Sequence, residues 1–142
     1  MRETLTISFS SKTINTRVAR AVIRSFLSHK GIFDEEIWDT ELGVNEAITN
    51  IIRHTYKGDQ TKYIIMTLVW DYTQRKIEIM LRDFGDQVDP EIIKPKTPSS
   101  DKEGGFGLYL INRIFDSVKL KNRDNGNLLI LTKTYAQSGD EN

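Results

Sequence analysis

Residues 41–56 read ELGVNEAITNIIRHTY, and the spacing of apolar residues in this stretch predicts a helix with two unlike faces. At about 100° per residue, one face of such a helix gathers five apolar residues: Val44, Ala47, Ile48, Ile51 and Ile52. Glu46, Asn50 and Arg53 gather on the opposite face. The apolar face predicts packing against a core. The polar face is either a solvated surface or one wall of a binding site, and this stretch alone does not decide between them.

The composition limits the classes of protein to which the chain can belong. Its 142 residues suit one compact domain, and its 20 acidic residues balance its 20 basic residues. Balanced charge gives no general attraction to nucleic acid or to a membrane, so we expect neither as a partner. The absence of cysteine excludes disulfides, thiolate metal sites and cysteine nucleophiles. The polar N-terminus and the lack of a long apolar run predict a cytoplasmic protein.

The pattern along the rest of the chain predicts one domain over residues 1–136 and a disordered tail over residues 137–142. Alternating or continuous apolar residues predict strands at residues 4–9, 63–70, 76–83, 117–121 and 128–134. Helical spacing predicts helices near residues 14–26, 34–54 and 108–116. We therefore expect an α+β fold: a two-layer sandwich with helices on one face of a mainly antiparallel, mixed sheet of about five strands.

Local features are also expected within this arrangement. Ser10 or Ser11 is expected to cap the first helix, and Asp34 the second. The run at residues 63–70 is apolar almost throughout, which predicts a central strand covered on both faces. The core-facing positions predicted for the first helix are Ile14, Val18, Ala21, Val22 and Phe26.

The segment from Gly85 to Gly105 has no regular pattern and contains all three prolines of the chain. A connection of this length in a compact domain is typical of a functional lid or a disordered segment. We expect a flexible lid over about residues 86–104, with a short helix near residues 90–93.

Two glycine-containing motifs flank the predicted lid. Asp83-Phe84-Gly85 ends a strand, and its carboxylate can accept a hydrogen bond from an exocyclic amine, although Asp-x-Gly is also a common turn. Gly104 to Gly107 opens a helix, where free backbone amides and the helix dipole favour a phosphate. Glycines at a helix start can equally serve packing or a hinge, so neither motif decides alone.

The order and spacing of these motifs resemble the GHKL (Bergerat) ATP-binding fold. Three pairs of residues match its three motifs in order: Glu46 and Asn50, Asp83 and Gly85, Gly105 and Gly107. The resemblance extends over the whole chain. The phrases NEAITNIIRHTY and GGFGLYLINRIFD are similar to the serine-kinase anti-sigma factors of bacterial partner-switching systems.

The resemblance implies a role for each matched residue. Asn50 would bind Mg²⁺ through its side-chain oxygen, and Asp83 would recognise the adenine amino group of ATP. Glu46 would orient or deprotonate a serine or threonine hydroxyl of a protein substrate. The remaining residues would shape the pocket and present backbone amides to the phosphates: Gly85, Gly105, Gly107 and Leu108.

Two departures from the family pattern affect the predicted site. Glu103 stands where some of these kinases carry arginine, which leaves Lys102 as the candidate lid cation for the phosphates. Gln87 stands where the second motif usually has a second glycine, and this side chain predicts reduced nucleotide affinity.

The resemblance implies an anti-sigma factor serine/threonine-protein kinase that phosphorylates a small anti-sigma-factor antagonist, sequesters a sigma factor and forms a homodimer. The alternating first strand is a plausible dimer interface. The alternative is a non-catalytic, ATP-gated binding switch, and retention of Glu46 favours the kinase. The catalytic domain of a histidine kinase is not favoured, because His29 lies at a predicted helix end and His54 beside the binding pair.

Overall fold

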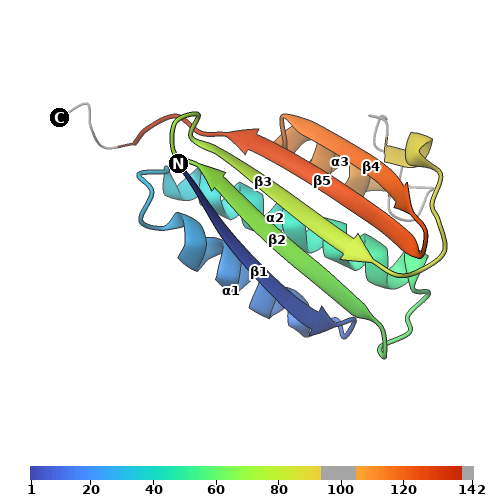
Figure 1. The fold of residues 1–142 in the computed structure, drawn as a ribbon. Helices are drawn as coiled ribbons and strands as arrows, with labels where there is room; N and C mark the ends of the chain where they lie inside the picture. Colours follow the sequence, from blue (N-terminus) through green and yellow to red (C-terminus); the bar gives the residue numbers. More distant parts are fainter. Residues whose placement is uncertain (94–104, 139–142) are drawn as a thin grey trace.

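The computed structural model describes residues 1–93 and 105–138, and for Gly105 and Phe106 it describes the backbone alone. One sheet has the strand order β1-β2-β3-β5-β4. Its strands are β1 (Arg2–Ser10), β2 (Tyr63–Asp71), β3 (Lys76–Asp83), β4 (Ser117–Arg123) and β5 (Gly126–Thr134). One face of the sheet is covered by α1 (Asn15–Leu27), α2 (Asp34–Asn50) and α3 (Gly105–Ile114) (Figure 1). The predicted α+β sandwich is confirmed, and all four strand pairings are antiparallel.

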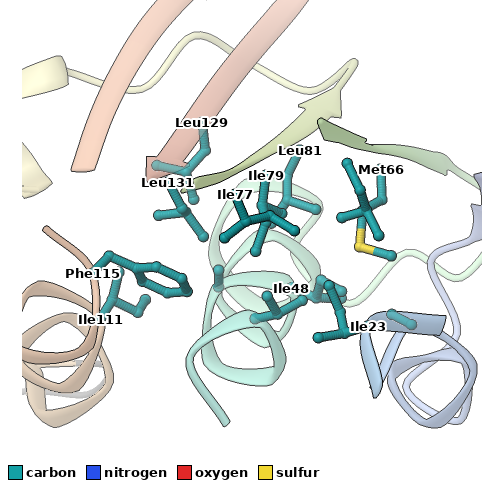
Figure 2. Packing of buried hydrophobic residues seen from close by; sticks show 14 of the residues in the cluster. Ile23, Ile48, Met66, Ile77, Ile79, Leu81, Ile111, Phe115, Leu129 and Leu131 are labelled. Atoms are coloured by element: carbon teal, nitrogen blue, oxygen red, sulfur yellow. The ribbon is translucent and has the colours of Figure 1, made fainter. Parts of the chain in front are cut away.

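The core lies between the sheet and the helices. Figure 2 shows Ile48 of α2 in the middle, with Ile23 of α1 on one side and Ile111 and Phe115 of α3 on the other. The three inner strands contribute alternate residues: Ile64, Met66, Leu68, Trp70, Ile77, Ile79, Leu81, Leu129 and Leu131. Full burial of one such side chain stabilises the fold by about 1.5–3 kcal/mol, so this alternation fixes which face of each strand meets the helices.

The outer face of α1 differs from the prediction. The sequence predicts Ile14 and Val18 in the core, but they are 57% and 49% exposed, and Ala21 is exposed as well. The residues of α1 that reach the core are Thr16, Ala19, Ile23, Phe26 and Leu27. Both sets follow helical spacing, and the set that contains the fully buried Ile23 and Leu27 faces the sheet.

Neither predicted helix cap is formed. The Ser11 hydroxyl donates a hydrogen bond to the backbone oxygen of Asp59, and Ser10 accepts one from the side chain of Asn15. Asp34 lies within the first turn of α2, where its carboxylate is 2.6 Å from a guanidinium nitrogen of Arg24. These polar groups connect neighbouring segments, and spacing along the sequence does not reveal such contacts.

The prediction for the second strand is wrong in one respect. β2 lies second in the sheet, and its residues alternate between buried and half-buried. Ile65, Thr67 and Val69 lie half-buried on the face that carries no helix (Figure 1). The apolar run at residues 63–70 therefore has one face that packs against the helices. Its other face is also apolar, and no described helix covers it.

The ends of two irregular segments are also defined. The short helix predicted near residues 90–93 is present as η2 (Pro90–Ile93), a 3₁₀ turn. The backbone N–H of Ser138 donates to Gly31 O at 2.9 Å, and the disordered tail over residues 137–142 stays a prediction. Residues 139–142 lie outside the described part of the chain. Within the described ranges, no helix is long and apolar enough to cross a membrane.

Candidate functional site

The end of α2 forms one wall of a pocket of about 290 Å³. Asn50 is the last residue of α2, and a π-helical turn, η1 (Ile51–Thr55), follows it directly. Such turns inside helices occur frequently at functional sites. Asn50, Ile51, His54 and Thr55 line the same pocket.

The other walls come from β3, the segment after it, α3, β4 and β5. They are mainly apolar and include Val88, Ile92, Ile93, Leu108, Ile111, Val118, Leu120 and Leu129. Among them stand two buried polar residues, Asp83 and Asn127. A mostly apolar pocket into which a few polar groups converge is typical of a small-molecule site.

Asp83 is 3% exposed at the end of β3. Its Oδ1 accepts hydrogen bonds from the backbone N–H of Gly85 and from Asn127 Nδ2, both at 3.0 Å. Burial raises the pKa of Asp83 above its ordinary value, and the hydrogen bonds from Gly85 and Asn127 act in the opposite direction. Because both bonds end on Oδ1, Oδ2 is the oxygen available to a ligand.

Gly107 brings the start of α3 against the polar side of α2. A Cβ atom at this buried glycine would lie 3.4 Å from Glu46 Oε1 and 3.8 Å from Asn50 Nδ2 and Oδ1. Glu46 and Asn50 are half-buried, and within the described residues neither side chain makes a hydrogen bond or ion pair. Two unpaired polar groups therefore adjoin a helix start, where free amides favour anions.

Gly85 packs against Thr55 at the end of the second helix, whereas Gly107 faces Glu46 and Asn50. A Cβ atom at Gly85 would lie 2.6 Å from Thr55 Cγ2 and 3.2 Å from Thr55 O. The neighbouring Phe84 donates its backbone N–H to the Tyr56 hydroxyl at 2.8 Å. Gly85 thus lets the turn after β3 pack closely on the end of α2, and it lines a polar hollow of about 460 Å³ beside the main pocket.

The remaining predicted residues are placed as follows. Leu108 lines the main pocket, and Gly105 is the first residue of α3. His54 lines the pocket and is exposed. Arg53 is exposed, as the solvated interpretation predicts.

Asn127 is a site residue that the sequence reasoning misses. It is 1% exposed, and its Nδ2 donates to Asp83 Oδ1 at 3.0 Å and to Asp86 O at 2.9 Å. Its Oδ1 accepts from the backbone N–H of Val88 at 2.9 Å and from Asn122 Nδ2 at 3.0 Å. Asparagine is depleted in strands, so its presence at the start of an apolar strand is the one feature of the sequence that indicates a special role for Asn127.

Gln87 also has a role that the sequence does not indicate. Its Nε2 donates to Arg123 O at 2.7 Å, and Asn122 Nδ2 donates to Val88 O at 2.9 Å. The side chain that replaces the second glycine of the motif therefore anchors the segment after β3 to the β4–β5 hairpin.

The predicted lid is only partly described. Residues 86–93 are held by these side-chain amides and by Asn112, whose Nδ2 donates to Ile93 O at 3.0 Å. These contacts hold the start of the predicted segment, and a flexible lid over about residues 86–104 stays a prediction. Lys102 and the rest of residues 94–104 lie outside the described part.

The donor set near Asn50 fits one kind of metal ion. Within the described residues, no group of three or more His, Asp or Glu side chains could hold a metal ion. Mg²⁺ usually keeps several waters and takes one or two protein oxygens together with phosphate oxygens. The carboxamide oxygen of Asn50 can supply such a ligand.

Comparison with known proteins agrees with this geometry. Residues 9–133 match the family described as histidine kinase-like ATPase domain. The chain belongs to this family. It is 34% identical over 128 residues to the serine-protein kinase RsbW of Oceanobacillus iheyensis, covering 84% of this chain and 79% of that protein. It is 32% identical over 122 residues to RsbW of Staphylococcus aureus, covering 80% and 76%.

A solved structure shares the fold of this RsbW-like chain. The chain holding the RsbU and RsbW domains of a Mycobacterium tuberculosis protein matches it with a TM-score of 0.71 at 17% identity. The match covers 96% of this chain and 33% of that longer one. At this identity the likeness shows the fold alone, and it agrees with the α+β sandwich predicted from the sequence.

Proposed function

We propose that this RsbW-like chain is a Mg-ATP-dependent protein serine/threonine kinase that phosphorylates a small anti-sigma-factor antagonist and sequesters a sigma factor. The position of Gly107, beside both Glu46 and Asn50, carries the proposal. Phosphates held at the start of α3 would lie next to a carboxylate and a carboxamide that are unpaired within the described residues. The relatives are named serine-protein kinases, which supports transfer to a serine hydroxyl.

The pocket supports binding of an adenine ring. Asp83 Oδ2 would accept a hydrogen bond from the exocyclic amine, and apolar side chains such as Leu108 and Ile111 would pack against the base. The depth of Asp83 in an apolar pocket would exclude water that competes for this hydrogen bond.

The start of α3 and the end of α2 would hold the phosphates. Backbone amides at Gly105, Gly107 and Leu108 would donate to phosphate oxygens. Asn50 would hold Mg²⁺, which when bound neutralises phosphate charge during transfer. Lys102 stays the candidate lid cation.

Glu46 would act as the catalytic base. The substrate hydroxyl oxygen attacks the γ-phosphorus of ATP and forms a new oxygen–phosphorus bond. The bond from this phosphorus to the oxygen bridging to the β-phosphate breaks, and ADP leaves with that electron pair. Glu46 accepts the hydroxyl proton, a role for which an unpaired carboxylate is suited.

The alternative is an ATP-gated switch that binds partners without phosphorylating them, and the Glu46→Ala variant separates the two functions. Incubation with ATP and the antagonist should add one phosphate to the antagonist by intact mass. Loss of the base should slow transfer about 100-fold or more and leave ATP affinity unchanged. Glu35→Ala, which removes an exposed carboxylate from the first turn of α2, is the matched control.

The possible outcomes are distinct. No transfer by the wild-type protein, with ATP bound and the correct antagonist present, would remove the kinase function and favour the switch. Transfer by Glu46→Ala at the wild-type rate would remove Glu46 from the mechanism.

We also propose that the chain forms a homodimer through β1 and the outer face of α1. Within the described residues β1 is an edge strand paired with β2 alone, and its residues 4–10 carry no charge. The opposite edge strand, β4, carries Lys119, Lys121 and Arg123, and such charges prevent edge pairing. Exposed Val18 on α1, the helix nearest β1 (Figure 1), and exposed Ile14 just before this helix add an apolar surface. A second copy would cover this uncharged edge.

A further inference from the structure

We propose that Asn127 is a positioning residue that fixes the carboxylate of Asp83 and thereby sets the preference of the site for adenine over 6-oxopurines. This inference rests on the proposed nucleotide-binding function. The three matched motifs do not include Asn127, and the proposal rests on the contacts of this side chain.

The sheet register places the two side chains together. Asp83 and Asn127 are direct cross-strand partners on β3 and β5. Direct partners on one face have Cβ atoms about 4.5–5.5 Å apart, so their side chains meet. Both residues are buried and line the same pocket.

The hydrogen-bond network fixes the orientation of the Asn127 carboxamide. Both Nδ2 hydrogens are used, toward Asp83 Oδ1 and Asp86 O. Oδ1 accepts two hydrogen bonds, from Val88 N and Asn122 Nδ2. If the oxygen and nitrogen were exchanged, the Asn127 oxygen would face two acceptors, Asp83 Oδ1 and Asp86 O. The Asn127 nitrogen would then face two donors, on Val88 and Asn122. The carboxamide therefore has one orientation.

A fixed carboxamide in turn fixes the carboxylate. Rotation of the Asp83 carboxylate would break the bonds that Oδ1 receives from Asn127 and Gly85. Oδ2 then remains as a bare acceptor, which matches the 6-amino donor of adenine. The 6-oxo group of hypoxanthine or guanine would place an acceptor against this oxygen, so a fixed, ionised Asp83 rejects it.

Loss of Asn127 should weaken this discrimination in particular. Without the Nδ2 donor, the carboxylate can turn, and it is more readily protonated in its buried site. A protonated carboxyl can donate a hydrogen bond to a 6-oxo group. ATP binding should therefore suffer more than binding of inosine triphosphate (ITP), which carries that group.

The test compares the dissociation constants of Mg-ATP and Mg-ITP by calorimetry for wild type, N127A and N122A. One hydrogen bond to a charged group predicts a wild-type preference for ATP of about 10- to 100-fold. N127A should lower this ratio about tenfold, because the bond to adenine loses its fixed geometry. N122A removes one of the four hydrogen bonds of the Asn127 side chain and leaves those with Asp83, Asp86 and Val88. These still fix the carboxamide, so the ratio for N122A should stay close to that of wild type.

A structural role alone would weaken both nucleotides equally in N127A, and that result would overturn the inference. A wild-type protein that binds ATP and ITP equally would also overturn it. A wild-type protein that binds neither would overturn the proposed function itself. If circular dichroism shows that N127A is unfolded, N127S, which has no group at the position of Nδ2, serves with the same expected ratio.

Discussion

Gly107 of α3 packs against the Glu46 carboxylate of α2, so that a Cβ atom at position 107 would lie 3.4 Å from Glu46 Oε1. The same atom would lie 3.8 Å from both polar atoms of the Asn50 side chain. One carboxylate, one carboxamide and the backbone of α3 therefore bound a common space. Glycine leaves this space open to a ligand, whereas any side chain would enter it.

Gly107→Ala should change stability and binding in opposite directions. Alanine in a helix is favoured over glycine by about 1 kcal/mol, and the contacts of the added methyl group are tight but not overlapping. We expect urea unfolding to show equal or greater stability, while calorimetry shows weaker Mg-ATP binding. Unchanged affinity with a folded variant would contradict the position assigned to the phosphates.

Gly85→Ala should destabilise the protein through Thr55. The added methyl group would overlap Thr55 Cγ2, at 2.6 Å, and crowd Thr55 O, at 3.2 Å. Overpacking of this kind costs about 1–3 kcal/mol in the free energy of unfolding. Thr55→Ser removes Cγ2, so the double variant should regain part of the loss in a double-mutant cycle. Strictly additive effects would show that the two residues do not meet.

Burial of Asp83 predicts a pH dependence of stability. The pKa of Asp83 is raised in the folded state above its ordinary value of 3.8, so the folded chain binds this proton more tightly than the unfolded chain. Between the two pKa values, the free energy of unfolding contributed by this group falls as pH rises. Urea unfolding over about pH 4 to 8 should show this component in wild type and not in Asp83→Asn. Identical profiles would contradict the assignment.

Val18→Glu should disrupt the proposed homodimer. Val18 is 49% exposed on the outer face of α1, and a buried carboxylate at an interface without a partner is costly. Analytical ultracentrifugation should show a wild-type dimer and a folded Val18→Glu monomer. Gln74→Glu, in the exposed β2–β3 turn, adds the same charge elsewhere and should leave the dimer intact. A monomeric wild type would contradict the proposed homodimer. A dimeric Val18→Glu variant would place the interface elsewhere.

The sequence predicts the fold well because its apolar periods are strong. The stretch at residues 41–56 shows one apolar face, and Ala47, Ile48, Ile51 and Ile52 are buried as that face predicts. The alternating residues of β3 likewise define its inner face. Local periodicity identifies elements of this kind, since burial repeats with the geometry of the helix or strand.

Features that depend on contacts across the fold are harder to predict. Val18 lies on the outer face of α1 because the other helical set of residues, which contains Ile23 and Leu27, packs against the sheet. The roles of Gln87 and Asn127 depend on hydrogen bonds to backbone oxygens distant in sequence, those of Arg123 and Asp86. Motif spacing marks Asp83 as a site residue, but it gives no sign of the side chain that orients it.

The most direct test of the proposed site is calorimetric binding of Mg-ATP by wild type and Asn50→Ala, with and without magnesium. Asn50 lies at the end of α2, beside Gly107 and in the wall of the pocket. We predict that wild type binds ATP in a magnesium-dependent manner and that Asn50→Ala severely weakens the magnesium-dependent part of the affinity. Equal affinity for Mg-ATP in the two proteins would contradict the assignment of this pocket as a Mg-ATP site.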